Sequence, residues 1–162
     1  MEDIAGTPAA ARIMEEGDST KPWSAEKIIT YCMSKGVNPA QIVIGGAFFG
    51  KGWIGVPPQN NGLYQPSRGS WRERNSYATI REKREDNNGF VRHWDPIAKA
   101  PFLYNATDSI FVSYEDTVSI RLKTEYAIKT GLGGIMFWSL GGDTPKDGLV
   151  NAIYTAKMKQ NK

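Results

Sequence analysis

The sequence predicts an α/β fold, and two short segments are the basis of this prediction. Ile42–Trp53 (IVIGGAFFGKGW) and Gly131–Asp143 (GLGGIMFWSLGGD) each contain an apolar run without helical periodicity, flanked by glycine. Such runs are typical of buried parallel strands that end in a tight turn. Segments with helical patterns lie beside both runs, so helices and strands are expected to alternate along the chain.

A helix is expected immediately before the first strand. Ser24 is a suitable N-cap, and Gly36 can end the helix in a left-handed conformation. The apolar side of this helix consists of Ile28, Ile29, Tyr31 and Cys32. After a short link, Ile42–Phe49 supplies the first strand.

The middle of the chain has a different character. From Gly50 to about Asn105, proline, glycine and asparagine interrupt short apolar or aromatic runs. This pattern favours a small inserted α+β domain, placed at residues 53–114, over a continuing repeat of strand and helix.

The last third of the chain returns to the first pattern. Ser119–Lys129 is predicted as a helix capped near Asp116 and closed by Gly131, followed by a strand at Gly134–Leu140 and a helix at Leu149–Met158. Residues 22–52 and 115–162 therefore read as part of a (β/α) barrel, and residues 1–21 as a tail or loop. A complete barrel needs eight strands and about 250 residues. With two such strands, this barrel is expected to be incomplete.

Composition excludes several functional classes. A net charge of +3 and 23% charged residues fit a globular protein, and the basic stretch Trp71–Asp86 is mixed with acids, which indicates a solvated helix rather than a nucleic-acid partner. The single cysteine, Cys32, and single histidine, His93, argue against a disulfide, a metal site or a catalytic triad. No membrane span and no secretory signal are expected.

Several further motifs are collinear with the two strand segments. They are NNGLYQ (Asn60–Gln65), GF followed by WD (Gly89–Phe90 and Trp94–Asp95), AKAPFLYN (Ala98–Asn105) and SYEDTVSIRLKTEYAIKTGLGG (Ser113–Gly134). From about Ser24 to Ile153 this set resembles the C-terminal half of a glycoside hydrolase family 18 chitinase. The resemblance implies the C-terminal part of a TIM barrel, with strands seven and eight on either side of a chitinase insertion domain.

The resemblance also implies substrate-binding residues. Trp138 would end strand eight and stack on a sugar ring, although a core tryptophan is the alternative interpretation. Phe49 and Lys51 stand where the family commonly has tyrosine and arginine, so a hydroxyl and a planar donor fork are lost. Trp53 is a further candidate, for which sugar contact and packing are both open.

The catalytic acid of the family has no counterpart in this sequence. Family 18 uses the glutamate of an Asp-x-x-Asp-x-Asp-x-Glu motif, together with the N-acetyl oxygen of the substrate. Neither this string nor the Met-x-Tyr-Asp turn of strand six is present. The nearest acidic clusters, Glu15–Asp18 and Glu115–Asp116, fall in loop or helix-cap contexts. No catalytic residue, metal or cofactor is therefore predicted.

Three functional hypotheses remain open. The chain is the wall and floor of a chitinase cleft for β-1,4-linked N-acetylglucosamine polymers and is inactive alone, or a lectin-like chitin-binding module, or one subunit of a split barrel. The partners expected are chitin or chito-oligosaccharide, and a missing N-terminal half-barrel or a second copy. Family members act mostly outside the cell, while the location of this chain stays open.

Overall fold

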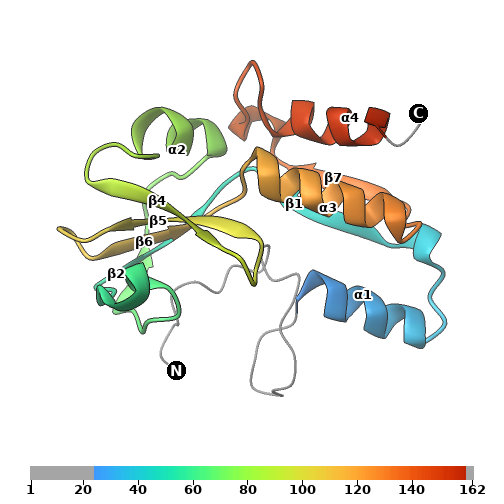
Figure 1. Ribbon diagram of the computed structural model, residues 1–162, viewed down its shortest axis with the longest axis horizontal. Helices are drawn as coiled ribbons and strands as arrows, with labels where there is room; N and C mark the ends of the chain where they lie inside the picture. The colour runs from blue at the N-terminus through green and yellow to red at the C-terminus, as the bar shows by residue number, and fades with distance from the viewer. Residues whose placement is uncertain (1–23, 160–162) are drawn as a thin grey trace.

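The fold consists of two β-sheets with helices around them, shown in a computed structural model that describes residues 24–159. The helices are α1 (Ala25–Ser34), α2 (Tyr77–Lys83), α3 (Thr117–Lys129) and α4 (Leu149–Lys159). The strands are β1 (Val43–Ala47), β2 (Lys51–Ile54), β3 (Gly69–Trp71), β4 (Phe90–Asp95), β5 (Ala100–Asn105), β6 (Ile110–Ser113) and β7 (Gly134–Trp138). Figure 1 shows the small sheet and the larger sheet side by side.

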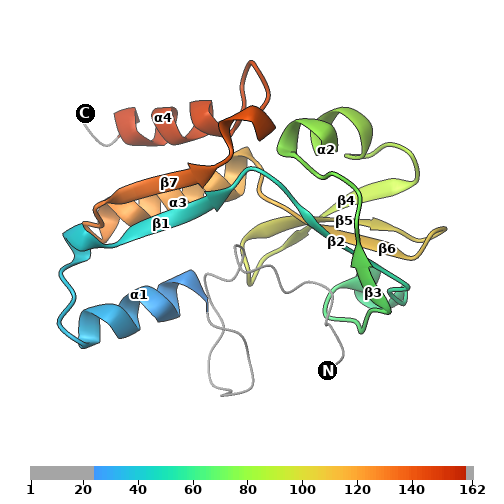
Figure 2. The ribbon, with the colours of Figure 1, turned by 180° about the vertical axis from the view of Figure 1, so that it is seen from behind.

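The small sheet pairs the two strands that lie furthest apart in the sequence. β1 and β7 run parallel, from Val43 opposite Gly134 to Ala47 opposite Trp138. α3 packs on one face of both strands and α4 packs on α3, whereas the opposite face is turned to the viewer in Figure 2. Gly46 allows the close approach of α3, because a Cβ atom there would lie 2.5 Å from Cδ1 of Ile120.

Local signals in the sequence define the ends of the main helices. The Ser24 hydroxyl accepts a hydrogen bond from the amide of Lys27, and Asp116 caps α3 through the amides of its first turn. Gly36 and Gly131 follow α1 and α3 with φ of 87° and 69°, values that glycine adopts without steric cost. The predicted helices are confirmed, with α3 beginning two residues before the expected Ser119.

The predicted strands are also confirmed, but they are shorter than expected. β1 ends at Ala47 rather than Phe49, and β7 ends at Trp138 rather than Leu140. At both ends the chain turns away to pack elsewhere: Phe48 enters the core, and Leu140–Gly142 forms a single 3-10 turn. The segment expected as a tail, residues 1–21, lies outside the described residues.

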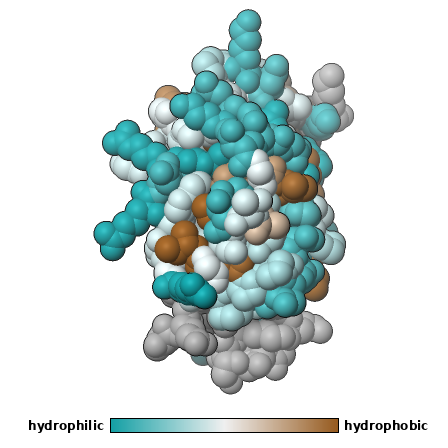
Figure 3. Space-filling view, turned by 90° about the vertical axis from the view of Figure 1, so that its left-hand side faces the viewer, coloured by the Kyte–Doolittle hydropathy of each residue, from teal (hydrophilic) through white to brown (hydrophobic). Residues whose placement is uncertain are grey.

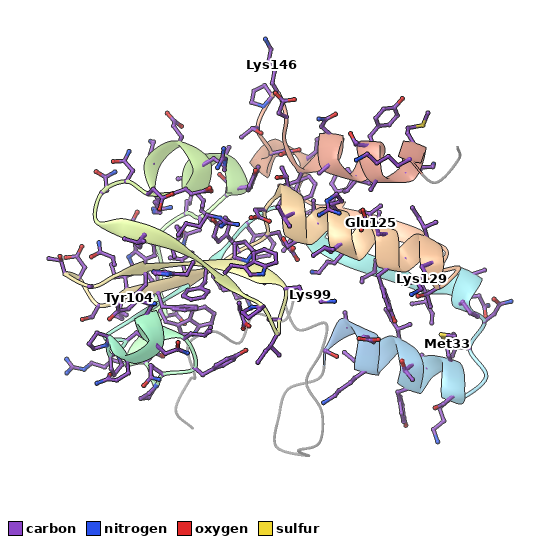
Figure 4. The ribbon with its side chains drawn as sticks, in the orientation of Figure 1. Met33, Lys99, Tyr104, Glu125, Lys129 and Lys146 are labelled. Atoms are coloured by element: carbon purple, nitrogen blue, oxygen red, sulfur yellow. The ribbon has the colours of Figure 1, made fainter. Side chains whose placement is uncertain are left out.

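The larger sheet is antiparallel, with strand order β3-β2-β6-β5-β4. Both faces of its central strands are buried. On one face Trp53, Phe102, Tyr104 and Phe111 cluster with Val56 and Leu63, and the Tyr104 hydroxyl donates to the carbonyl of Val56 at 2.9 Å. Tyr104 lies within this sheet in Figure 4. The other face packs against α2, so large side chains stabilise a sheet of short strands.

A shared core joins the two sheets. Its buried members come from the antiparallel sheet, from α2, α3 and α4, and from the segments that follow β1 and β6, and they are Phe48, Tyr77, Ile80, Phe90, Leu103, Val112, Tyr114, Ile120 and Leu149. Ile135 and Phe137 of β7 are partly buried and pack against this core. Phe48 stacks on Phe137 of β7 with ring centroids 4.7 Å apart. The antiparallel sheet begins at Lys51, close to the start of the predicted insertion at residue 53, and its packing is continuous with that of the parallel sheet.

Charged groups reinforce the junction between the antiparallel sheet and α3. Arg92 of β4 contacts Asp116, with Nη2 and Oδ2 2.5 Å apart, and its Nε lies 3.8 Å from Glu85. The Tyr114 hydroxyl donates to Glu85 at 3.2 Å. Burial raises the pKa of Tyr114, and the Glu85 carboxylate raises it further, so this hydroxyl stays a donor at neutral pH.

A second ion pair is fully buried beside this junction. Lys123 of α3 and Glu115 have side chains 2% and 1% exposed, and they form a direct ion pair. The other carboxylate oxygen of Glu115 accepts a hydrogen bond from Ser119 at 2.6 Å. Removal of one partner would leave a buried charge without compensation, and this is much more costly than loss of the whole pair.

We therefore predict that Lys123→Met lowers the free energy of unfolding by about 3–5 kcal/mol. The double variant Lys123→Met/Glu115→Leu should recover most of this loss, because no charge is then left in the core. Urea denaturation measures both variants. Lys129→Met, an exposed lysine on the same helix, is the control and should change stability by less than about 0.5 kcal/mol. Equal stability of Lys123→Met and wild type would contradict a buried pair.

Candidate functional site

A cavity of about 460 Å³ opens beside the parallel sheet, between α1 and β1. Its wall is mostly apolar. The lining residues are Ala25, Ile28 and Ile29 of α1, residues 42–47 of β1, Phe49, Lys51, Ser113, Tyr114, Glu115, Lys123 and Trp138. The cavity thus lies where β1, β7, the first strand of the antiparallel sheet and the start of α3 meet.

Trp138 is the most exposed aromatic side chain at this cavity. It is the last residue of β7, 70% exposed, and the peptide bond that follows it is cis. Ligands of parallel α/β sheets bind at the carboxyl ends of the strands, and Trp138 stands at such an end. An indole that packed in the core would be covered by its own protein, whereas Trp138 is largely exposed among the described residues.

Phe49 and Lys51 line the same cavity as Trp138. Phe49 follows β1, is 40% exposed, and forms an isolated bridge with Ser76. Lys51 is exposed at the start of β2, opposite Ser113 of β6. Within residues 24–159 no carboxylate forms an ion pair with Lys51, so its ammonium group can donate hydrogen bonds to a ligand.

Trp53 does not line this cavity. Its side chain is 7% exposed and lies 6.0 Å from Phe111, centroid to centroid, within the antiparallel sheet. Lys51 and Trp53 are two residues apart on one strand and share a face, but Val56 and Leu63 cover the tryptophan. The structure therefore brings together three of the four predicted residues and gives Trp53 the packing position that the sequence left open.

The buried pair Glu115 and Lys123 also lines the cavity, and the sequence did not indicate this. The two residues are eight positions apart, and only the approach of α3 to β1 brings both to the wall. Glu115 is the one carboxylate among the described lining residues, and both of its oxygens have partners. The aromatic and polar side chains of the cavity can therefore stack on a ligand and form hydrogen bonds with it. Among the described lining residues there is no carboxylate without a partner that could transfer a proton.

Other chemistry finds little support in the part of the chain that the structure describes. His93 lies in the antiparallel sheet, stacked on Phe102 with centroids 5.1 Å apart, and burial lowers its pKa. Residues 24–159 contain no group of three or more histidine, cysteine or acidic side chains that could hold a metal ion. In the same range no helix has the length and apolar character needed to cross a membrane.

Comparison with known proteins gives a consistent set of relatives. The family model described as "Glycosyl hydrolases family 18" matches residues 3–143. The chain is 39% identical over 120 residues to chitinase A1 of Niallia circulans, and this match spans 70% of this chain and 17% of that protein. It is 32% identical over 145 residues to chitinase B of Serratia marcescens, covering 76% of this chain and 29% of that protein.

The fold agrees with solved structures of the same family. A family 18 N-acetylglucosaminidase from Paenibacillus barengoltzii superimposes with a TM-score of 0.82 at 34% identity, over 96% of this chain and 44% of that chain. This chain therefore spans less than half the length of these relatives. The match over residues 3–143 covers most of the sequence and includes both parallel strands. The chain belongs to glycoside hydrolase family 18.

Proposed function

We propose that this chain forms the floor and one wall of a cleft for chito-oligosaccharide in a family 18 glycoside hydrolase. The observation that carries the proposal is the position of Trp138, 70% exposed at the end of β7 and lining an apolar cavity with Phe49 and Lys51. The substrate class follows from the relatives, which are chitinases and an N-acetylglucosaminidase.

The three residues supply complementary contacts for a pyranose ring. The indole of Trp138 offers a flat apolar surface on which the C–H face of a sugar can stack at a small cost in side-chain entropy. Phe49 adds a second ring beside it. Lys51 donates hydrogen bonds to sugar oxygens from one ammonium group, whereas an arginine would present two parallel donors.

The antiparallel sheet serves as the wall in this proposal. β6 ends at Ser113, which lines the cavity together with the next two residues, Tyr114 and Glu115. Arg92 connects the same sheet to Asp116 at the start of α3. The segment at residues 53–114 is the predicted chitinase insertion domain. Its shared core with the parallel strands supports a wall that keeps a fixed angle to the floor.

Hydrolysis needs a group that these 162 residues do not contain. The reaction of this family requires a carboxylic acid that protonates the leaving oxygen, while the N-acetyl oxygen of the substrate attacks. The 162 residues contain no Asp-x-x-Asp-x-Asp-x-Glu string, and Glu115 is held by Lys123 and Ser119. The chain on its own is therefore a binding surface. Turnover of chitin by the purified chain, at a rate that follows its concentration through every purification step, would refute this.

The first prediction concerns Trp138. Trp138→Ala should weaken binding of chitotetraose by about tenfold, because the stacking surface is lost. Isothermal titration calorimetry with wild type and variant measures the change. The matched control is Tyr154→Ala, since Tyr154 is 60% exposed on α4 and does not line this cavity. No heat of binding at millimolar sugar, or equal loss in both variants, would contradict the proposal.

The second prediction concerns Phe49 and Lys51, the two positions at which this chain differs from the tyrosine and arginine common in the family. Phe49→Tyr/Lys51→Arg should tighten binding by about threefold to tenfold, because it restores a hydroxyl and a planar donor fork at the cavity. Lys51→Met, which removes the ammonium group but retains much of the aliphatic bulk, should weaken it. The same titration compares the three proteins. Unchanged affinity in all of them would show that Phe49 and Lys51 do not contact the sugar.

A further inference from the structure

The turn that carries Phe49 to the cavity is hydrogen-bonded to the start of α2 and to the residues just before it. The Gly50 amide donates to the carbonyl of Asn75 at 2.6 Å, and the Tyr77 amide donates to the carbonyl of Phe48 at 2.9 Å. These two bonds lie on either side of Phe49. The position of the Phe49 ring at the cavity therefore depends on where the segment before α2 lies.

Arg84 holds that segment from its other side. It is the C-cap residue of α2, and its Nη1 atom donates to Oδ1 of Asn75 at 2.5 Å and to the carbonyl of Arg74 at 2.8 Å. Asn75 is buried, and its Nδ2 atom donates to the carbonyl of Glu73 at 3.0 Å. The side chain and the carbonyl of Asn75 are thus both engaged, the first with Arg84 and the second with Gly50.

Trp71 completes this set of contacts on the side of β2. The guanidinium of Arg84 lies over the indole of Trp71, 4.6 Å from the ring centroid. Trp71 pairs with Gly52 of β2, and a Cβ atom at Gly52 would lie 2.7 Å from Cε3 of the indole. The contacts therefore begin and end at β2 and the residue before it. We call their members the Arg84 cluster: Gly52, Trp71, Arg84, Asn75 and Gly50.

Packing alone does not account for an arginine in this cluster. Figure 3 shows the end of the molecule that the antiparallel sheet forms, where the surface is mainly hydrophilic with separate small hydrophobic patches. A charged side chain is normally solvated, but Arg84 is 8% exposed, and burial lowers its pKa. Its ion-pair partner Glu73 is 62% exposed and 3.4 Å away. An apolar side chain would fill the same space without the cost of desolvating a charge, whereas only a donor can hold Asn75.

We propose that Arg84 is a positioning residue for sugar binding, which fixes the turn of Phe49 through Asn75 and Gly50. Arg84 does not line the cavity, so it acts through the turn rather than on the sugar. The proposal rests on the proposed function, because that function gives Phe49 a sugar to contact. Trp138 ends β7, outside the Arg84 cluster. Arg84 therefore supports the contribution of Phe49 to binding and not that of Trp138.

The test is a double-mutant cycle on the affinity of the full chain for chitotetraose, measured by isothermal titration calorimetry. Arg84→Met, which retains much of the aliphatic bulk but no donor, should weaken binding by about threefold to tenfold. In a Phe49→Ala background the same change should have no further effect, because the contact that it positions is gone. In a Trp138→Ala background it should weaken binding by the full factor, since the two contributions are independent.

Two further variants separate positioning from a general loss of structure. Arg84→Lys retains the charge but lacks the planar donor fork, so it should recover only part of the lost affinity. Lys83→Met, at an exposed lysine of the same helix, is the control and should leave the affinity unchanged. Equal weakening by Arg84→Met in the wild-type and Phe49→Ala backgrounds would overturn the proposal, as would unchanged affinity of Arg84→Met.

A second readout needs no sugar and so distinguishes this proposal from the proposed function. In ¹⁵N spectra of the free protein, Arg84→Met should shift the amide signals of Phe49 and Gly50, whereas the signal of Gly36, beyond α1, should stay in place. Absence of chitotetraose binding by the wild type would refute the proposed function, and the amide signals would still test the positioning. Unchanged signals of Phe49 and Gly50 in Arg84→Met would overturn the positioning alone.

Discussion

The packing of Phe48 is the constraint on which the rest of the structure depends. Its side chain is 1% exposed and stacks on Phe137, which links the residue that follows β1 to β7. Its amide donates to Trp138, and its carbonyl accepts from the amide of Tyr77 at the start of α2. One residue thus contacts the parallel strands and the helix that covers the antiparallel sheet.

The burial of Phe48 explains the exposure of its neighbours. Because the chain alternates at this point, Phe49 turns to the cavity while Phe48 turns to the core. The hydrogen bond from Phe48 holds the carbonyl of Trp138, so the end of β7 is fixed although its indole is open to solvent. A backbone that is already fixed beneath the exposed rings favours ligand binding, because little backbone conformational entropy is then lost when a ligand binds.

The sequence predicted those parts of the fold that depend on local signals. Ser24, Asp116, Gly36 and Gly131 end their helices as expected, since caps act over three or four residues. The exact ends of β1 and β7 could not be predicted, because distant core contacts turn the chain there. Whether Trp53 contacts sugar or packs in the protein could not be predicted either, because its partner Phe111 lies on a strand more than fifty residues away. The ion pair of Glu115 with Lys123 at the cavity could not be predicted either, because it forms only when α3 packs against β1.

The central claim is that a chito-oligosaccharide stacks on Trp138, and the indole N–H resonances of the protein test it most directly. In ¹⁵N spectra, titration with chitotetraose should shift the Trp138 signal, assigned through Trp138→Phe. The signal of buried Trp53 should stay in place. A shift confined to other tryptophans, or no shift at millimolar sugar, would contradict a sugar-binding floor at the end of β7.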